Sequence, residues 1–169
     1  TEIYTLSLHD ALPILGCMKR KFFLDTNIFV YSFHDAPKKE IALELIRQAH
    51  LRNGCISYQV IQEFLNVALK KFEKPAKYDD LLVYLKKILF PICETFPSER
   101  LFADALDISE RWKYSFHDAL IIASALESKC EILYSEDLHS GQKIRELTIV
   151  NPFRSEEHTS ELQSPNTIS

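Results

Sequence analysis

Short apolar runs and longer amphipathic stretches alternate along this chain, and the change of period between them predicts its elements. The apolar runs are short and contain aromatic or β-branched residues, which favour buried strands. The expected strands are residues 21–24, 55–57, 92–96, 131–134 and 147–150.

The stretches between these runs carry apolar residues three and four positions apart, which is the spacing of one helix face. Pro37 suits the first position of a helix, and Pro75 and Pro91 each end one. The expected helices are residues 38–53, 58–71, a segment from Asp79 or Asp80 to Pro91, 98–112 and 116–128, with 28–33 as a short helix or turn. The helix at 116–128 is apolar nearly all round after Asp118, so it should be buried.

Strands that alternate with helices indicate an α/β fold, in which helices cover both faces of a mostly parallel sheet. With 169 residues, the chain has room for one domain and hardly for two. It has only three glycines and lacks both GxxxxGK[ST] and GxGxxG, which argues against the usual glycine-rich phosphate loops.

The net charge of −4 comes from the two ends of the chain. Residues 18–153 hold 19 basic and 19 acidic side chains, whereas residues 1–17 contain no Lys or Arg. Thr1–Ile14 resembles the translation of a widely used sequencing adapter, and Arg154–Ser164 resembles that of its partner. We therefore expect residues 1–17 and 154–169 to be non-native, disordered flanks of a domain at 18–153.

Nothing in this central domain predicts export or membrane insertion. The apolar stretch Phe22–Phe33 is interrupted by Asp25 and Asn27, and no run of about 18 apolar residues occurs. Cys55, Cys93 and Cys130 lie far apart in the sequence and form no CxxC pair. Free thiols in a reducing cytoplasm fit this pattern better than disulfides or a zinc site.

Acidic residues stand where an α/β sheet binds its ligands, beyond the carboxyl ends of the strands. Asp25 follows the first strand, and Asp137 follows the strand at 131–134, with Glu136 as a competing candidate beside it. Asp118 lies in the first turn of the alanine-rich helix, and Glu63 lies among apolar residues of another helix. Carboxylates that converge repel one another unless a cation compensates them, and hard oxygen ligands suit Mg²⁺ or Mn²⁺.

Each acid also has a purely structural interpretation. Asp25 can form a turn at the end of its strand, and Asp118 can cap its helix or match the helix dipole. Glu63 can point to solvent, and Asp137 can be an ordinary loop residue. Only the joint pattern favours metal-dependent phosphate-ester chemistry.

Four segments, in this order, resemble the PIN-domain family, and within it the VapC-type toxins of type II toxin–antitoxin systems. They are FFLDTNIFVY at 22–31, YQVIQEF at 58–64, FHDALIIASAL at 116–126 and ILYSEDLHSGQ at 132–142. The resemblance implies a three-layer α/β/α sandwich and a cytoplasmic endoribonuclease that uses Mg²⁺ or Mn²⁺ to activate a water molecule. It also implies an antitoxin partner, an RNA substrate, a homodimer and no membrane association.

The resemblance also assigns the site residues. Asp25, Glu63, Asp118 and Asp137 match the family's acidic positions and would be both metal ligands and catalytic residues. Thr26, Asn27, Ser135 and Glu136 would support those ligands by hydrogen bonds. Basic residues flanking the acids would contact phosphate, and the candidates are Lys19, Arg20, Lys21, Lys38, Lys39, Lys70, Lys71 and Lys74.

Other functions remain open at this point. A dehalogenase-type phosphatase needs a second acid two residues after the first, where this chain has Asn27. A response-regulator receiver needs paired acids near the start and a late lysine, an arrangement that the chain does not show. A structure-specific DNA nuclease and a non-catalytic PIN-like module that binds RNA or protein are the remaining alternatives.

Overall fold

A computed structural model gives the arrangement of the chain and describes residues 20–33, 37–70 and 77–154. Both expected flanks therefore lie almost wholly outside the described residues, as do Lys19, Lys71 and Lys74. The helices are α2 (Thr26–Tyr31), α3 (Lys38–Leu51), α4 (Tyr58–Lys70), α5 (Tyr78–Tyr84), the π-helix η1 (Leu85–Leu89), the 3₁₀-helix η2 (Phe90–Ile92), α6 (Glu99–Trp112) and α7 (Phe116–Glu127). The strands are β1 (Phe22–Leu24), β2 (Gly54–Ser57), β3 (Cys93–Thr95), β4 (Ile132–Tyr134), β5 (Lys143–Ile144) and β6 (Leu147–Val150).

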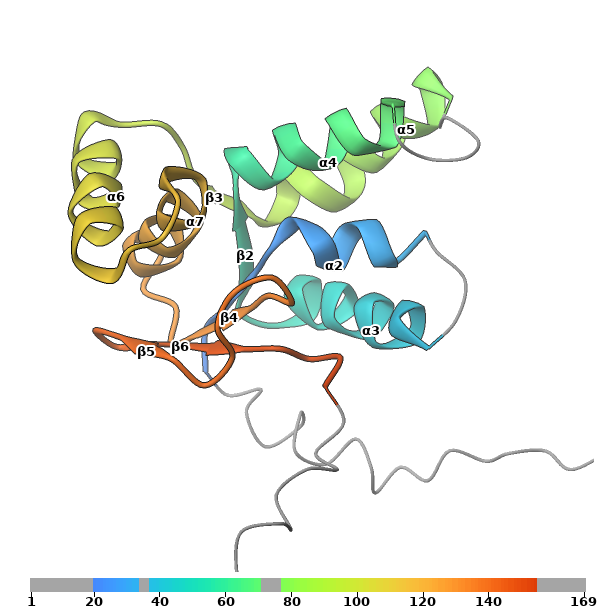
Figure 1. Ribbon diagram of the computed structural model, residues 1–169. Coiled ribbons are helices and arrows are strands. Elements are labelled where there is room, and N and C mark those ends of the chain that lie inside the picture. Colours follow the sequence, from blue (N-terminus) through green and yellow to red (C-terminus); the bar gives the residue numbers. More distant parts are fainter. Residues whose placement is uncertain (1–19, 34–36, 71–76, 155–169) are drawn as a thin grey trace, which may run out of the picture.

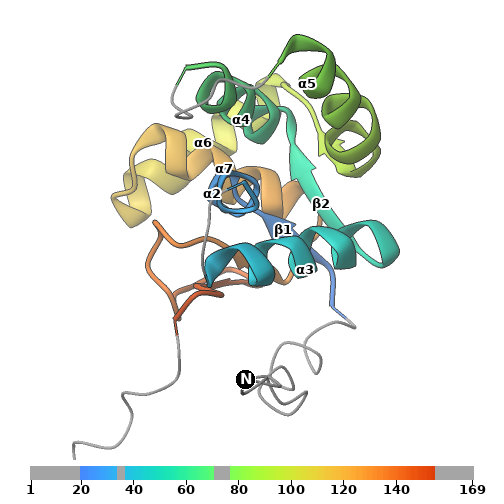
Figure 2. The ribbon, with the colours of Figure 1, turned by 90° about the vertical axis from the view of Figure 1, so that its right-hand side faces the viewer.

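The strands of the described residues form one six-stranded sheet in the order β3-β2-β1-β4-β6-β5. Every pair is parallel except β5 and β6, which are antiparallel. In Figure 1, α6 and α7 lie on one side of this sheet and α2 and α3 lie on the other. Figure 2 shows α3 running across the face that α6 and α7 leave free. The expected α/β architecture with a mostly parallel sheet is confirmed.

Strand β5 is absent from the sequence prediction. It contains two residues and is joined to β6 by Arg145 and Glu146, with Arg145 at φ 53°. Tight hairpins are usually recognised by glycine or asparagine at such a position, and this turn has neither. The short strand therefore left no signal in the sequence.

The helix expected to end at Pro91 changes its winding before it gets there. The α-helix α5 passes into η1 at Leu85, and Pro91 lies inside η2. Proline lacks an amide hydrogen and clashes with the carbonyl four residues earlier, so α-helical winding cannot continue through it. The predicted helix therefore has the expected extent, but it consists of α-, π- and 3₁₀-helical segments instead of a single α-helix.

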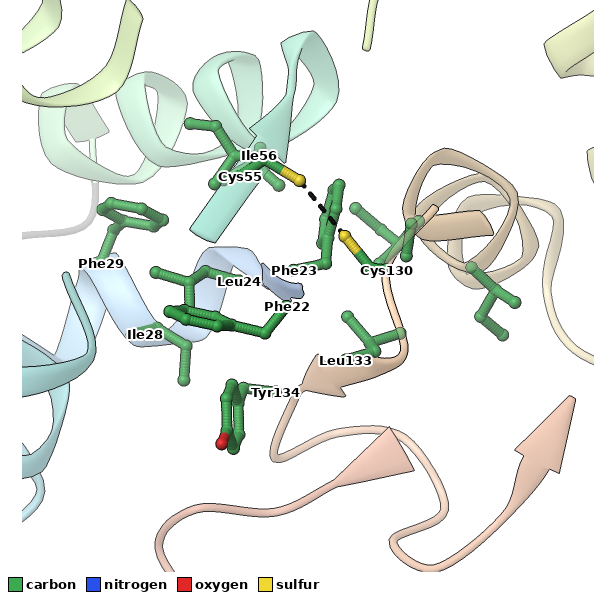
Figure 3. Close-up of a cluster of buried hydrophobic side chains, with 14 of the residues drawn as sticks. Phe22, Phe23, Leu24, Ile28, Phe29, Cys55, Ile56, Cys130, Leu133 and Tyr134 are labelled. Atoms are coloured by element: carbon green, nitrogen blue, oxygen red, sulfur yellow. Dashed lines mark hydrogen bonds between the residues drawn. The ribbon is translucent and has the colours of Figure 1, made fainter. Parts of the chain in front are cut away.

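The core lies on both faces of the two central strands. All three residues of β1 are buried, and so are those of β4. Phe22 packs edge-on against Tyr134 with ring centroids 5.6 Å apart (Figure 3). The helix α7 is buried from Ala119 to Ala125, as its apolar composition predicts. No helix of the described residues is long and apolar enough to cross a membrane.

Two features bring elements unusually close together. Gly54 of β2 lies against α3, where an added Cβ would meet Ala49 at 2.4 Å. The thiols of Cys55 and Cys130, which are distant in the sequence, lie 3.3 Å apart in the core (Figure 3). The three cysteines that the structure describes are free thiols, as expected.

Candidate metal centre

Four carboxylates from separate segments line one cavity of about 390 Å³. Asp25 directly follows β1, and Asp137 lies in the loop after β4, which is the parallel neighbour of β1. The carboxyl ends of neighbouring parallel strands meet at one edge of a sheet, so these two residues reach the same cavity. Glu63 enters it from α4, and Asp118 enters it from the first turn of α7.

Asp25 is the deepest of the four acids, with 9% of its surface exposed. One carboxylate oxygen accepts a hydrogen bond from the Thr26 amide at 2.6 Å and thereby caps α2. The other accepts one from the Ser135 hydroxyl at 2.6 Å. Burial raises the pKa of Asp25 to about 6, against the effect of these two hydrogen bonds. The nearby carboxylates of Glu63 and Asp137 contribute to this raised pKa, which makes Asp25 a group that a cation would stabilise.

Glu63 is held by donors on both of its oxygens. Thr26 donates its hydroxyl to Oε2 at 2.7 Å, and Gln59 donates its amide to Oε1 at 2.8 Å. The Nδ1 atom of His117 lies 2.7 Å from the same Oε1. The carboxylate is therefore fixed by residues from three different helices.

Asp118 and Asp137 are more exposed than Asp25, and the carboxylate of each accepts a hydrogen bond from a neighbouring side chain. The Ser115 hydroxyl oxygen accepts a hydrogen bond from the Asp118 amide at 3.2 Å and thereby caps α7. The same hydroxyl donates a hydrogen bond to the Asp118 carboxylate at 2.7 Å. Asn27 donates its side-chain amide to Asp137 at 3.3 Å. Asp25 is thus the N-cap of α2, whereas Asp118 is a first-turn acid of α7, whose N-cap is Ser115. Both acids line the cavity as well.

Glu136, which the sequence leaves as an alternative to Asp137, contacts Lys38 and lies outside the lining of the cavity. Its carboxylate forms an ion pair with Lys38, whose Nζ also lies 4.3 Å from the ring centroid of Tyr31. Burial raises the pKa of Glu136, but hydrogen bonds from Lys38 and Tyr31 outweigh it and hold that pKa below its usual value. Asp137 lines the cavity and Glu136 does not. The structure therefore favours Asp137 as the fourth acid.

The expected supporting residues contact different acids. Ser135 bonds to Asp25, Thr26 to Glu63 and Asn27 to Asp137. The expected support from Glu136 has no counterpart, because its carboxylate is engaged by Lys38. Its role is to tie the loop after β4 to the start of α3.

The donor set fits a hard divalent cation, since it consists of carboxylate oxygens with neutral amide oxygens beside them. Asn27 Oδ1 and Gln59 Oε1 are buried acceptors without a partner, and both residues line the cavity. As the side chains stand, however, no three acidic, His or Cys groups of the described residues are close enough to hold one ion. A site with three or more such ligands therefore requires some of these side chains to move.

The sequence analysis did not predict that Gln59 and His117 contact Glu63 or that Ser115 contacts Asp118. Gln59 stands four residues before Glu63, which places the two side chains on one face of α4. That spacing was visible in the sequence, but it occurs in most helices. The contacts with His117 and Ser115 depend on how α7 packs, which no local pattern reveals.

Several basic residues expected to contact phosphate are engaged elsewhere. Lys21 pairs with Glu94, and Lys38 pairs with Glu136. Arg20 lies 3.7 Å from Glu131. Among the described candidates, Lys39 and Lys70 stay without an ion pair in the structure.

Comparison with known proteins shows the family of the chain that forms this cavity. The sequence model of the PIN domain matches residues 22–142, which include all four acids. The chain belongs to the PIN domain family. The resemblance carried by the four sequence segments is therefore confirmed. No curated protein sequence matches the chain.

Solved structures show the same fold at low identity. A toxin–antitoxin complex from Klebsiella pneumoniae has a chain with 18% identity and a TM-score of 0.60, aligned over 80% of this chain and 100% of its own. VapC20 of Mycobacterium tuberculosis is a toxin that cleaves the sarcin–ricin loop. It has 17% identity and a TM-score of 0.54, aligned over 69% of this chain and 90% of its own. VapBC2 of Rickettsia felis was solved with a DNA fragment from its promoter. The matching chain has 21% identity and a TM-score of 0.53, aligned over 76% of this chain and 96% of its own.

Proposed function

We propose that this PIN domain is a metal-dependent endoribonuclease that uses Mg²⁺ or Mn²⁺ and acts as the toxin of a type II toxin–antitoxin pair. The observation that carries this proposal is the convergence of Asp25, Glu63, Asp118 and Asp137 on one cavity. Burying or crowding carboxylates is costly unless a cation compensates them. The raised pKa of Asp25 shows that cost in the ion-free protein.

The four acids would hold the ion, and their neighbours would keep them in place. Asp25 would remain tied to Ser135, while Glu63 would keep the hydroxyl of Thr26. A divalent ion in such a site lowers the pKa of a water molecule and stabilises charge on a phosphate oxygen. The products would carry a 5′-phosphate and a 3′-hydroxyl.

The partners belong to the proposal as well. The fold is shared with a chain of a toxin–antitoxin complex from Klebsiella pneumoniae, and also with VapC20, a toxin that cleaves the sarcin–ricin loop. We infer an antitoxin that covers the cavity, RNA as the substrate, a homodimer and a cytoplasmic site of action.

Cleavage of RNA by the purified chain tests the activity. With Mn²⁺ or Mg²⁺ we expect labelled single-stranded RNA to be cut, and Asp25→Asn or Asp118→Asn to reduce the rate by at least about 100-fold, as expected when a metal site loses a ligand. Gel analysis of labelled oligonucleotides gives the rates. Asp80→Asn is the matched control, because Asp80 is exposed on α5 and does not line the cavity.

DNA of the same sequence serves as the second substrate. Preferential cleavage of DNA would replace the ribonuclease proposal with the DNA-nuclease alternative. Equal rates for Asp25→Asn, Asp118→Asn and the unchanged protein would reject the assigned site.

A non-catalytic RNA- or protein-binding module is the second candidate, and one observation favours it. The acids of the described residues do not stand close enough to share an ion without moving. RNA binding that is unaffected by EDTA, with no cleavage under any divalent ion, would support this module over the nuclease.

A further inference from the structure

Gln59 connects the two helices that carry Glu63 and Asp118. It is the second residue of α4, and only 3% of its surface is exposed. Its Nε2 atom lies 2.8 Å from Glu63 Oε1 in its own helix and 3.2 Å from the backbone carbonyl of His117 in α7. His117 directly precedes Asp118, so one side-chain amide holds both acid-bearing segments.

The neighbours of Gln59 leave its amide a single orientation. A carboxylate and a carbonyl oxygen can only accept hydrogen bonds, so they take the two N–H groups of the amide. A flipped amide would place Oε1 against both acceptors. An ionised carboxylate cannot donate, so His117 Nδ1, 2.7 Å from Glu63 Oε1, is the donor in that contact. The same Nδ1 lies 3.0 Å from Gln59 Nε2 and in this tautomer accepts no hydrogen bond from it.

These contacts restrict the carboxylate of Glu63. Thr26, Gln59 and His117 supply three donors to a group that has about four lone-pair positions. The remaining position is therefore fixed in direction before any ion arrives. Gln59 Oε1 is itself buried without a partner, and the residue lines the cavity, where a water molecule can supply the donor.

We propose that Gln59 is a positioning residue that aims the Glu63 carboxylate and the first turn of α7 at a shared divalent ion. The proposal rests on the proposed function, since it requires that the cavity binds metal. It goes beyond that function by assigning a role to the side-chain N–H groups of a neutral residue, which hold two acid-bearing segments together.

Metal binding without substrate is the test. Free Mn²⁺ gives an electron paramagnetic resonance signal that is lost on binding, so titration of the full chain yields the dissociation constant. We expect Gln59→Leu, which keeps the bulk and removes the amide, to weaken Mn²⁺ binding by about 10-fold or more. Gln62→Leu makes the same change at an exposed position of the same helix and should leave the affinity unchanged.

The thermal midpoint of the ion-free protein separates positioning from folding. The expected result is weaker Mn²⁺ binding by a Gln59→Leu protein whose midpoint stays within a few degrees of the unchanged chain. If Gln59→Leu does not fold, Gln59→Met, which is unbranched like glutamine, takes its place in the same titration.

Two results would overturn the proposal, and they differ from failure of the proposed function. Equal Mn²⁺ affinity in the unchanged, Gln59→Leu and Gln62→Leu proteins would show that Gln59 has no positioning role while the metal site stands. An affinity loss that Gln62→Leu reproduces would also reject it. Absence of Mn²⁺ binding by the unchanged protein would remove the metal-dependent function itself, and this proposal with it.

Discussion

At the scale of single residues, Asp25 combines a structural role with an electrostatic cost. Its carboxylate caps α2 and accepts from Ser135, yet it is buried beside other acids and its pKa is raised to about 6. The folded, ion-free protein therefore binds a proton at Asp25 more tightly than the unfolded chain, where the usual value of 3.8 applies. Stability from this group is present at low pH and is lost as the pH rises through about 6.

Replacing Asp25 tests whether the stability of the protein falls as the pH rises through about 6. Between pH 5 and 7.5, in EDTA, the free energy of unfolding of the unchanged protein should fall by about 1 kcal/mol more than that of Asp25→Asn. Urea unfolding at the two pH values measures both quantities. The Ser135 hydroxyl can turn to accept from the new amide, so the variant should fold and be the more stable protein at pH 7.5. Equal pH dependence in the two proteins would contradict the raised pKa.

The residue scale also shows where sequence reasoning was limited. Asp25 and Asp137 were selected because they follow strands, and Asp118 because it lies in the first turn of a helix. Glu63 was selected because it lies among apolar residues of a helix, and all four acids line the cavity. The choice between Glu136 and Asp137 could not be made, because neighbouring residues of a loop point in directions that only the packing decides. The contact with Lys38 that removes Glu136 from the site joins residues 98 positions apart.

At the scale of elements, the position of α3 depends on the missing side chain of Gly54. A Cβ there would lie 2.4 Å from both Cα and Cβ of Ala49 and 2.7 Å from the Phe22 ring. Because two of these atoms belong to a helix packed on the sheet, Gly54→Ala should lower the free energy of unfolding by about 1–3 kcal/mol.

Urea unfolding of Gly54→Ala measures this effect, and Gly141→Ala provides the comparison. Gly141 has φ 88° and open space around it, so alanine there costs only backbone strain of about 1 kcal/mol. A smaller loss at Gly54 than at Gly141 would mean that α3 can move away from β2 at little cost.

The same scale explains which elements the sequence predicted. Helices α4, α6 and α7 match their expected bounds to within about a residue, since the spacing of apolar residues marks α4, Ser98 marks the start of α6 and the apolar composition marks α7. The irregular end of α5 and the two-residue β5 were missed. Both are set by contacts and turns rather than by a repeating pattern.

At the scale of the whole molecule, an ion bound to the folded form alone should stabilise the entire domain. At a concentration of Mn²⁺ 100 times its dissociation constant, the gain is about 2.7 kcal/mol, which corresponds to a rise of several degrees in the thermal midpoint. Differential scanning calorimetry with Mn²⁺ or with EDTA measures it. The rise should disappear in Asp118→Asn and persist in Asp80→Asn, and a rise of equal size in both would place the ion elsewhere.

The central position of β1 has a consequence for a chain that is still being made. Asp25 and Ser135, which meet at the cavity, are separated by 110 residues, and so are Asn27 and Asp137. A growing chain therefore carries its first acid long before the strand that completes the cavity exists. The cavity therefore cannot form until the ribosome has added Ser135 and Asp137 to a chain that already contains Asp25 and Asn27.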